Sequence, residues 1–268
     1  MFMFPDLSQL QRQEDMKVET GGGFIFDIAV VSDTRLLVIV NYKPKVILMN
    51  SQTGEEVAQI TLKCCPCRLC MFDNIRAVVT LGNKSLQFIT LNGDSLELGR
   101  SFSVNGNVWG ISRSEDRLIA SYCSPPGLEV LSMDGRVIHT FSNQAAGEDV
   151  FRWSSSISSA EGMVYVSNWK KSTITQLDSN LRVIRTYSDP ILQSPHGIIS
   201  VSADQMLVCS KGNHRILLLC LSTGVFTSIL GQQDGIEIPY ALTYSPSQKK
   251  LYIVPNETPG RIQVFQQQ

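Results

Sequence analysis

Residues 206–220 read MLVCSKGNHRILLLC, an apolar run, a short polar loop and a second apolar run. Five other segments follow the same plan: LLVIVNYKPKVILMN at 36–50, AVVTLGNKSLQFIT at 77–90, LIASYCSPPGLEVLS at 118–132, VYVSNWKKSTITQLD at 164–178 and LYIVPNETPGRIQVF at 251–265. The spacings between them are 40, 42, 46, 42 and 46 residues, counted on the first apolar residue after each loop, which is Val46, Leu86, Leu128, Ile174, Ile216 and Ile262. Self-similarity at a nearly fixed period indicates a repeat protein.

A second set of positions repeats with the same period. The apolar residue that opens the strand before each segment recurs after 41, 42, 46, 41 and 44 residues, at Ile28, Leu69, Ile111, Ile157, Ile198 and Leu242. Turn pairs such as Thr53-Gly54 and Asn92-Gly93 follow each third run, so each repeat has room for four short strands, a to d. Four-stranded repeats of about 40–45 residues are typical of propeller blades.

The sequence therefore predicts one all-β domain, a six-bladed β-propeller of four-stranded antiparallel blades. The expected blades are residues 21–62, 63–104, 105–150, 151–192, 193–235 and 236–268. The sixth repeat stops after its third strand, and we expect residues 14–20 to supply the fourth strand and close the ring. A short helix over residues 7–16 is the alternative for this segment.

Composition narrows the class of protein. Of 268 residues, 43% are hydrophobic and 18% charged, which suits a folded core, and the net charge of -1 shows no bulk attraction to nucleic acid or membrane. The longest wholly apolar run, residues 216–221, is too short to span a bilayer. The first residues lack a signal-peptide pattern, and the seven cysteines are not spaced as a disulfide framework. We expect a reducing, cytoplasmic location.

One blade carries a family motif. Residues 211–216, KGNHRI, and residues 195–198, PHGI, resemble the loop and the opening strand of an NHL repeat. The other blades match in hydrophobic pattern and turn placement, although Asn41, Cys209 or a serine stands where many NHL blades carry an aspartate. The chain resembles the divergent NHL-type propellers that end tripartite-motif ubiquitin ligases. This resemblance implies a recognition module that selects targets for an attached ligase, or, as in strongly basic members, binds single-stranded RNA.

One face of the predicted propeller is enriched in cations and aromatic rings. The loops joining strands b and c carry eight cations against one anion, Glu257, whereas the d–a loops on the same face mix Lys63, Arg68 and Arg152 with Glu148, Asp149, Asp234 and Glu237. Two residues before each strand-a position stand Phe26, Cys67, Trp109, Ser155, His196 and Tyr240, which we expect to surround the mouth of the channel. Trp169, Trp153, Tyr42 and Phe24 lie nearby.

This face is the expected binding surface, with either a protein segment held by aromatic anchors or single-stranded RNA stacked on the rings. The candidate partner-binding residues are Lys43, Lys45, Lys84, Trp109, Trp169, Lys170, Lys171, His196, Lys211, His214, Arg215, Tyr240 and Arg261. Of these, Lys170, Lys171, Lys211 and Arg215 are expected to form one patch with Trp169 and His196.

No constellation in the sequence predicts catalysis or a cofactor. The CxxC within residues 64–70 has no second ligand pair, and His139, His196 and His214 belong to different blades or loops. The inner strands offer a calcium ion only Asp27 and Asn107. We expect no enzymatic activity in this chain, no metal, no membrane partner and no small-molecule substrate.

Overall fold

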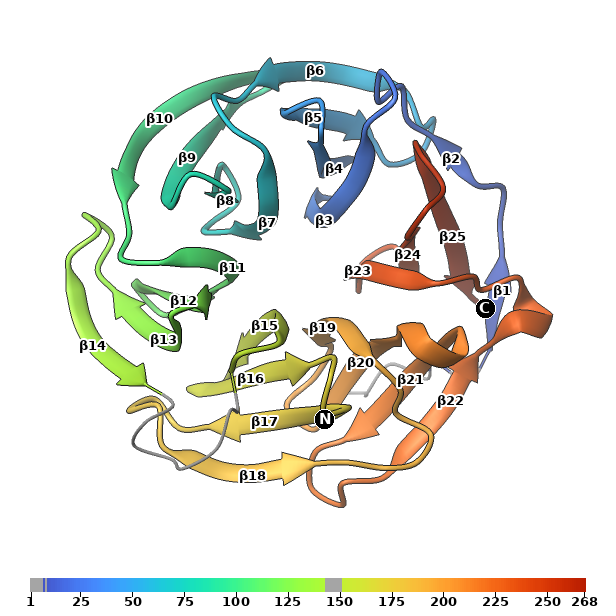
Figure 1. Ribbon diagram of the computed structural model, residues 1–268. Helices are drawn as coiled ribbons and strands as arrows, with labels where there is room; N and C mark the ends of the chain where they lie inside the picture. Colours follow the sequence, from blue (N-terminus) through green and yellow to red (C-terminus); the bar gives the residue numbers. More distant parts are fainter. Residues whose placement is uncertain (1–6, 8, 143–150) are drawn as a thin grey trace.

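The structure, a computed structural model, describes residues 7, 9–142 and 151–268. Six antiparallel sheets stand radially around a central channel (Figure 1), which confirms the predicted propeller. Glu148 and Asp149, and with them the expected end of the third blade, lie outside the described residues.

The strands of each blade run from the channel outward in chain order. Blades one to three contain β3 (Phe24–Ser32), β4 (Arg35–Asn41), β5 (Lys45–Asn50) and β6 (Glu56–Thr61); β7 (Pro66–Met71), β8 (Arg76–Leu81), β9 (Ser85–Asn92) and β10 (Ser95–Ser103); and β11 (Asn107–Ser114), β12 (Arg117–Ser124), β13 (Pro126–Leu131) and β14 (Val137–Ser142). Blades four to six contain β15 (Ser154–Ala160), β16 (Met163–Asn168), β17 (Thr173–Leu177) and β18 (Val183–Tyr187); β19 (Pro195–Ser200), β20 (Gln205–Ser210), β21 (Arg215–Cys220) and β22 (Phe226–Leu230); and β23 (Pro239–Ser245), β24 (Lys250–Pro255) and β25 (Arg261–Gln267). Two single-turn 3-10 helices, η2 (Lys211–Asn213) and η3 (Gln232–Asp234), lie in loops.

The core lies between neighbouring blades. Strands b and c are buried on both faces, which is why they read as continuous apolar runs rather than as an alternating pattern. Between the first two blades, for example, Leu37 and Ile39 of β4 pack in one cluster with Ala77 and Val79 of β8. Each d strand has one side facing solvent, so its pattern is weaker.

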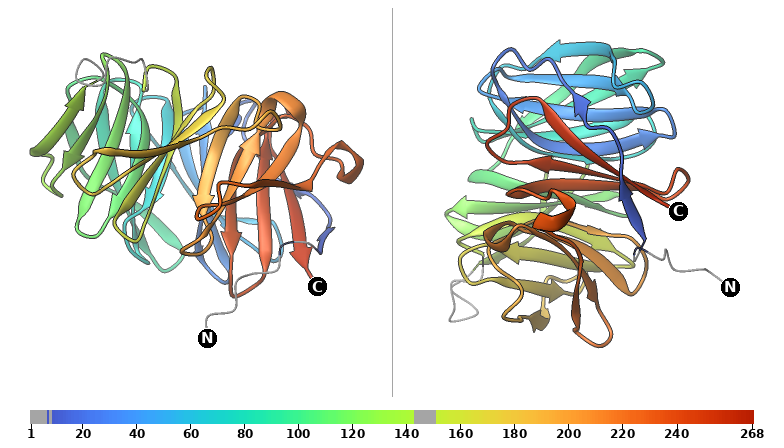
Figure 2. Two further views of the ribbon diagram at one scale, coloured as in Figure 1. Left: turned by 90° about the horizontal axis from the view of Figure 1, so that it is seen from below. Right: turned by 90° about the vertical axis from the view of Figure 1, so that its right-hand side faces the viewer.

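An N-terminal strand closes the ring, as the sequence predicts. The fourth-strand position of the sixth blade is filled by two short strands, β1 (Leu10–Arg12) and β2 (Met16–Lys17), both antiparallel to β25 (Figure 2). The paired residues therefore begin four positions earlier than expected, and the alternative of a helix over this segment is wrong for the part that the structure describes. Asp15, between the two strands, forms an ion pair of 2.7 Å with Arg261 of β25.

The ends of the blades define two faces. Strand a enters the channel from the d–a loop, so the d–a and b–c loops lie together on what we call the top face, and the a–b and c–d turns lie on the bottom face. Side views show the two faces as the ends of a short, thick disc (Figure 2).

Candidate binding surface and central channel

A β-bulge interrupts every inner strand near the top face. In each a–b ladder the pairing shifts by one residue at the same place, for instance between Ile25 and Asp27 and between Val108 and Gly110. The corresponding shifts in the other blades occur at 66–68, 154–157, 195–198 and 239–241. An extra residue in a strand re-aims its side chains. The bulges contain the six residues that the repeat alignment places at the mouth: Phe26, Cys67, Trp109, Ser155, His196 and Tyr240.

Buried hydroxyl groups of strand b stabilise three of these bulges. The side chains of Thr80, Ser121 and Ser167 accept hydrogen bonds of 2.9, 3.0 and 3.0 Å from the backbone N–H groups of Arg68, Gly110 and Ser156. Each hydroxyl is wholly buried, so without it the bulge N–H would lose its partner away from water.

Rings of three bulges and of residues near the top-face loops form a continuous row across the top face. Centroid distances are 5.3 Å from Trp153 to Trp169, 6.4 Å from Trp169 to His196, 5.1 Å from His196 to Tyr240 and 5.5 Å from Tyr240 to Phe26. Tyr42 follows at 6.5 Å from Phe26, and Phe24 at 6.1 Å from Tyr42. We call these seven rings the aromatic arc: Trp153, Trp169, His196, Tyr240, Phe26, Tyr42 and Phe24.

The arc has buried rings at its centre and exposed rings toward its ends. His196 and Tyr240 are only 9% and 6% exposed, whereas Trp169 is 38% and Tyr42 68% exposed. Most neighbouring pairs meet edge to face, an arrangement that aromatic pairs favour.

Cations of the chain lie against the rings of this arc. Lys170 Nζ is 4.7 Å and the Arg152 guanidinium 5.6 Å from the centre of the Trp153 ring. Lys211 Nζ is 5.8 Å from the ring of Tyr240. Such contacts are favourable because the face of an aromatic ring carries a negative potential.

Arg68 fills the centre of the channel beneath the arc. The sequence suggested a loop cation on the top face, but Arg68 lies within β7, is 3% exposed and points across the channel, so that expectation is wrong. Its guanidinium donates to the carbonyl oxygens of Ser155, Cys67 and Phe26 at 3.1, 2.9 and 3.2 Å. It also stacks 4.7 Å from the ring of Tyr240. One side chain thereby ties together the first, second, fourth and sixth blades.

Small residues of other blades leave room for this side chain. The residue just before each strand-a position is Asp27, Arg68, Gly110, Ser156, Gly197 and Ala241, so four of the six are small. At Gly197 a Cβ would come within 2.9 Å of the backbone of residues 240 and 241, so the fifth and sixth blades approach closely only with glycine there.

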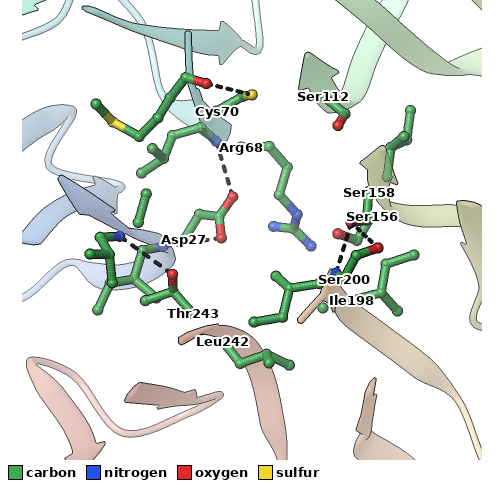
Figure 3. Close-up of a pocket in the computed structure, with 18 of the residues that line it drawn as sticks. Asp27, Arg68, Cys70, Ser112, Ser156, Ser158, Ile198, Ser200, Leu242 and Thr243 are labelled. Carbon is green, nitrogen blue, oxygen red and sulfur yellow. Dashed lines mark hydrogen bonds between the residues drawn. The ribbon is translucent and has the colours of Figure 1, made fainter. Parts of the chain in front are cut away.

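Below Arg68 the channel opens into a cavity of about 480 Å³ lined by both polar and aliphatic side chains (Figure 3). Asp27 faces the guanidinium from the first blade, and Ser156, Ser158 and Ser200 face it from the fourth and fifth. The Asp27 carboxylate accepts hydrogen bonds of 3.0 Å from the N–H groups of Ile28 and Leu69. Burial raises the pKa of Asp27, an effect that the charge of Arg68 and the two N–H donors oppose.

The two histidines of the top face are both engaged by the backbone. His196 Nδ1 lies 3.0 Å from the carbonyl oxygen of Ser194, and burial lowers the pKa of His196 to about 4, with Lys211 and Arg68 acting in the same direction. His214 Nδ1 accepts a hydrogen bond of 3.2 Å from the N–H of Ile238, which ties a b–c loop to the next d–a loop.

The predicted basic residues divide into two groups. Three are bound by their own blade or by the closing segment: Lys45 Nζ donates to the Glu19 carbonyl oxygen and to Gln59 Oε1 at 3.1 and 3.0 Å, Arg215 donates to Ser228 Oγ at 3.0 Å, and Arg261 pairs with Asp15. Lys43, Lys84, Lys170 and Lys171 are exposed, and Lys211 is partly exposed. Lys170 and Lys211 join the aromatic arc with Trp169 and His196, whereas Arg215 bonds instead to the neighbouring outer strand.

Trp109 lies on the opposite side of the mouth from the arc, half-buried, with its ring 5.9 Å from the Arg68 guanidinium. All three tryptophans of the chain therefore sit at the top of the channel.

The thiols of the CxxC segment are buried in part, whereas hydrogen bonds from Ser222 and Thr223 lower the pKa of Cys220. All seven cysteines are free thiols, and burial raises the pKa of Cys67 to about 11 and that of Cys70 to about 12, so neither is poised as a nucleophile. Within residues 7, 9–142 and 151–268 no three histidine, cysteine or acidic side chains are grouped as metal ligands would be. No helix in the same part of the chain is long and apolar enough to cross a membrane.

Comparison with known proteins defines the class by fold alone. No model of a protein family and no curated protein matches the chain. Among solved structures, virginiamycin B lyase from Staphylococcus aureus is similar, with a TM-score of 0.69 at 11% identity over 96% of this chain and 99% of that one. A catalytically inactive variant of that lyase with quinupristin gives 0.70 at 10% identity over the same shares. A protein of unknown function from Desulfotomaculum acetoxidans gives 0.64 at 13% identity, over 87% of this chain and 75% of that one. The chain is a six-bladed β-propeller, and these likenesses reach no further than its fold.

Proposed function

We propose that this chain is a non-catalytic recognition module that recruits a protein partner through the aromatic arc. The observation that carries the proposal is the aromatic arc, in which Phe26, His196 and Tyr240 of the bulges lie beside the exposed rings of Trp169 and Tyr42 from b–c loops. Exposed aromatic anchors beside well-packed ones are what protein partners use as centres of binding.

The geometry supports binding rather than chemistry at this surface. Rings and ammonium groups offer contact area and charge, and both histidines of the face are held by backbone partners. The resemblance of residues 195–198 and 211–216 to NHL repeats supports the finer proposal that the partner is a target for a tripartite-motif ubiquitin ligase, whose chemistry would reside in a RING domain. The seven free cysteines support a reducing, cytoplasmic setting.

Two matched variants test the proposal in cells. Tyr42→Ala removes an exposed ring of the arc, and Ile75→Ala removes a side chain of similar exposure, 55% against 68%, from the bottom face. Proteins labelled by proximity to the wild-type chain should be lost with Tyr42→Ala and Trp169→Ala and retained with Ile75→Ala, with and without nuclease.

Equal labelling by all variants would remove the arc as the binding surface. Labelling that depends on the arc and disappears with nuclease would instead support single-stranded RNA binding, for which the lysines beside the rings are the observation in favour.

A further inference from the structure

Two rings of the aromatic arc, those of Trp153 and Tyr240, already make cation–π contacts with side chains of the chain itself. Trp153 has Lys170 and Arg152 within 6 Å of its centre, and Tyr240 has Arg68 and Lys211. A cationic side chain of a partner would meet both occupied rings and like charge. The surface is therefore better suited to an anionic ligand, which could form ion pairs with the ammonium groups of Lys170 and Lys211.

Lys170 and Lys211 stand toward the two ends of one row. Trp153, Trp169, His196 and Tyr240 follow each other at centroid steps of 5.3, 6.4 and 5.1 Å, with Lys170 at the first ring and Lys211 at the last. An extended peptide advances about 3.3 Å per residue, so the path along the row is matched by at most about five residues of a strand. Neither ammonium has an ion-pair partner among the described residues.

The ring geometry favours a peptide over a nucleic acid. Bases need open ring faces on which to stack. Here neighbouring rings meet at 75° between Trp153 and Trp169, the central rings are buried, and cations lie against the ring faces. Phosphate binding along a strand also needs many free cations, whereas Lys45, Arg215 and Arg261 are held by their own blades or by the closing segment.

We infer that the arc binds a short extended acidic segment of a protein, with carboxylates at Lys170 and Lys211 and apolar side chains against Trp169. This inference rests on the proposed recognition function and names the chemistry of its ligand. The carboxylates of the segment would fix its orientation along the row and select for negative charge, and the exposed indole of Trp169 would supply contact area.

The test uses defined probes and the three tryptophans, all at the top of the channel, as reporters. Acetylated hexaglutamate, acetylated hexalysine and hexauridylate are titrated into the full chain at low salt and at about 0.15 M salt, where exposed charges are separated by a Debye length of about 8 Å. Hexaglutamate should change the tryptophan fluorescence saturably at both salts, and hexalysine should not.

Charge reversals locate the site. Lys170→Glu and Lys211→Glu should each weaken hexaglutamate binding about tenfold. Lys249→Glu, an exposed lysine in the a–b turn of the sixth blade on the bottom face, should leave it within twofold. Wild-type melting temperatures for all three variants establish that the fold is kept.

Three outcomes overturn the inference: no saturable response to hexaglutamate, equal weakening by Lys249→Glu, or tighter binding of hexauridylate with the same dependence on Lys170 and Lys211. Each is distinct from failure of the proposed function. If proximity labelling is lost with Tyr42→Ala but unaffected by Lys170→Glu and Lys211→Glu, the recognition function stands and its acidic ligand does not.

Discussion

The upper half of the channel is filled by rings and by Arg68, whereas the lower half, built from the same six strands, surrounds a cavity of about 480 Å³ lined by hydroxyl groups and aliphatic side chains. The bulges lie at the boundary between them. Above it large side chains of several blades touch one another, and below it shorter side chains such as Ser112, Ser158 and Thr243 line the cavity. One extra residue in each inner strand thus separates a part that presents large side chains to the channel from a part that presents smaller ones.

Because of this difference, substitutions in the two halves of the channel should affect stability to different extents. The upper half couples the blades directly through Arg68 and the arc, so it should be sensitive to substitution. The lower half joins neighbouring blades by packing and by single hydrogen bonds, such as those from the N–H of Ser200 to Ser158 Oγ at 3.1 Å and from the N–H of Val30 to Thr243 Oγ1 at 3.3 Å, so one substitution there should cost less. The predictions that follow test this contrast, in order of expected effect.

Opening the ring should damage both halves at once. Removing residues 1–19 exposes the edge of β25 and takes away Leu7, Met16 and Val18, all buried. Burial of such side chains contributes about 1.5–3 kcal/mol each, so the loss approaches the whole stability of a domain, which is about 5–15 kcal/mol. Urea unfolding followed by circular dichroism measures it. Removing residues 1–6, which keeps these contacts, is the control; equal midpoints for both truncations would contradict ring closure by this strand.

Arg68→Met should lower the stability of the upper half of the channel. It leaves three carbonyl oxygens of the bulges without their donor and removes the stack on Tyr240. We expect a loss of about 3–5 kcal/mol, as when one member of a buried charged network is removed. Denaturant unfolding gives the free energy and tryptophan emission reports the local change. Arg68→Lys should recover only part of the stability, because an ammonium lacks the planar fork of donors. Wild-type stability of Arg68→Met would refute the role of Arg68 as a link between blades.

Acid should weaken the upper half through His196. Its pKa is lowered to about 4 in the folded state against 6.5 in the unfolded chain, so between these values the unfolded state binds the extra proton and stability falls as pH falls. From pH 7 to pH 5 the loss is about 2 kcal/mol at 1.36 kcal/mol per pKa unit. Urea midpoints across this range measure it. His196→Gln should abolish that share of the dependence while other groups keep theirs; identical pH profiles would contradict the assignment.

Ser112→Ala should have the smallest effect. Ser112 lines the lower cavity, and its truncation removes a single hydroxyl group. We expect a change in unfolding free energy within about 0.5 kcal/mol, as for substitutions away from packed features. Thermal melting beside Arg68→Met makes the comparison direct. A loss above about 1 kcal/mol would show that the lower half is as tightly coupled as the upper.

The sequence predicts the ring because its signals are local and repeated. Apolar runs and turn pairs recur six times, and aligning them places Phe26, Trp109, His196 and Tyr240 at equivalent positions beside the channel mouth. Side chains alternate between the two sides of a strand, so the residue before each buried strand-a position faces the channel. This alternation could have placed Asp27 and Arg68 in the channel from the sequence.

What the sequence does not reveal depends on contacts between distant segments. Arg68 reads as a loop cation because its partners Phe26 and Ser155 lie in other blades. Arg261 reads as part of a basic face because its partner, Asp15, belongs to the closing segment. Composition counts charges, whereas only the fold shows which of them are already paired.

Closure of the ring by residues 10–17 also imposes an order on events during synthesis. These residues leave the ribosome long before residues 261–267, with which they pair. At about 5–20 residues per second, the interval is of the order of tens of seconds. Throughout it Leu10 to Lys17 have no partner strand, and β25 arrives at a blade that lacks its outer edge. The nascent chain therefore cannot complete the sixth blade until residues 10–17 and 261–267 have both been made, so this blade joins two segments far apart in time as well as in sequence.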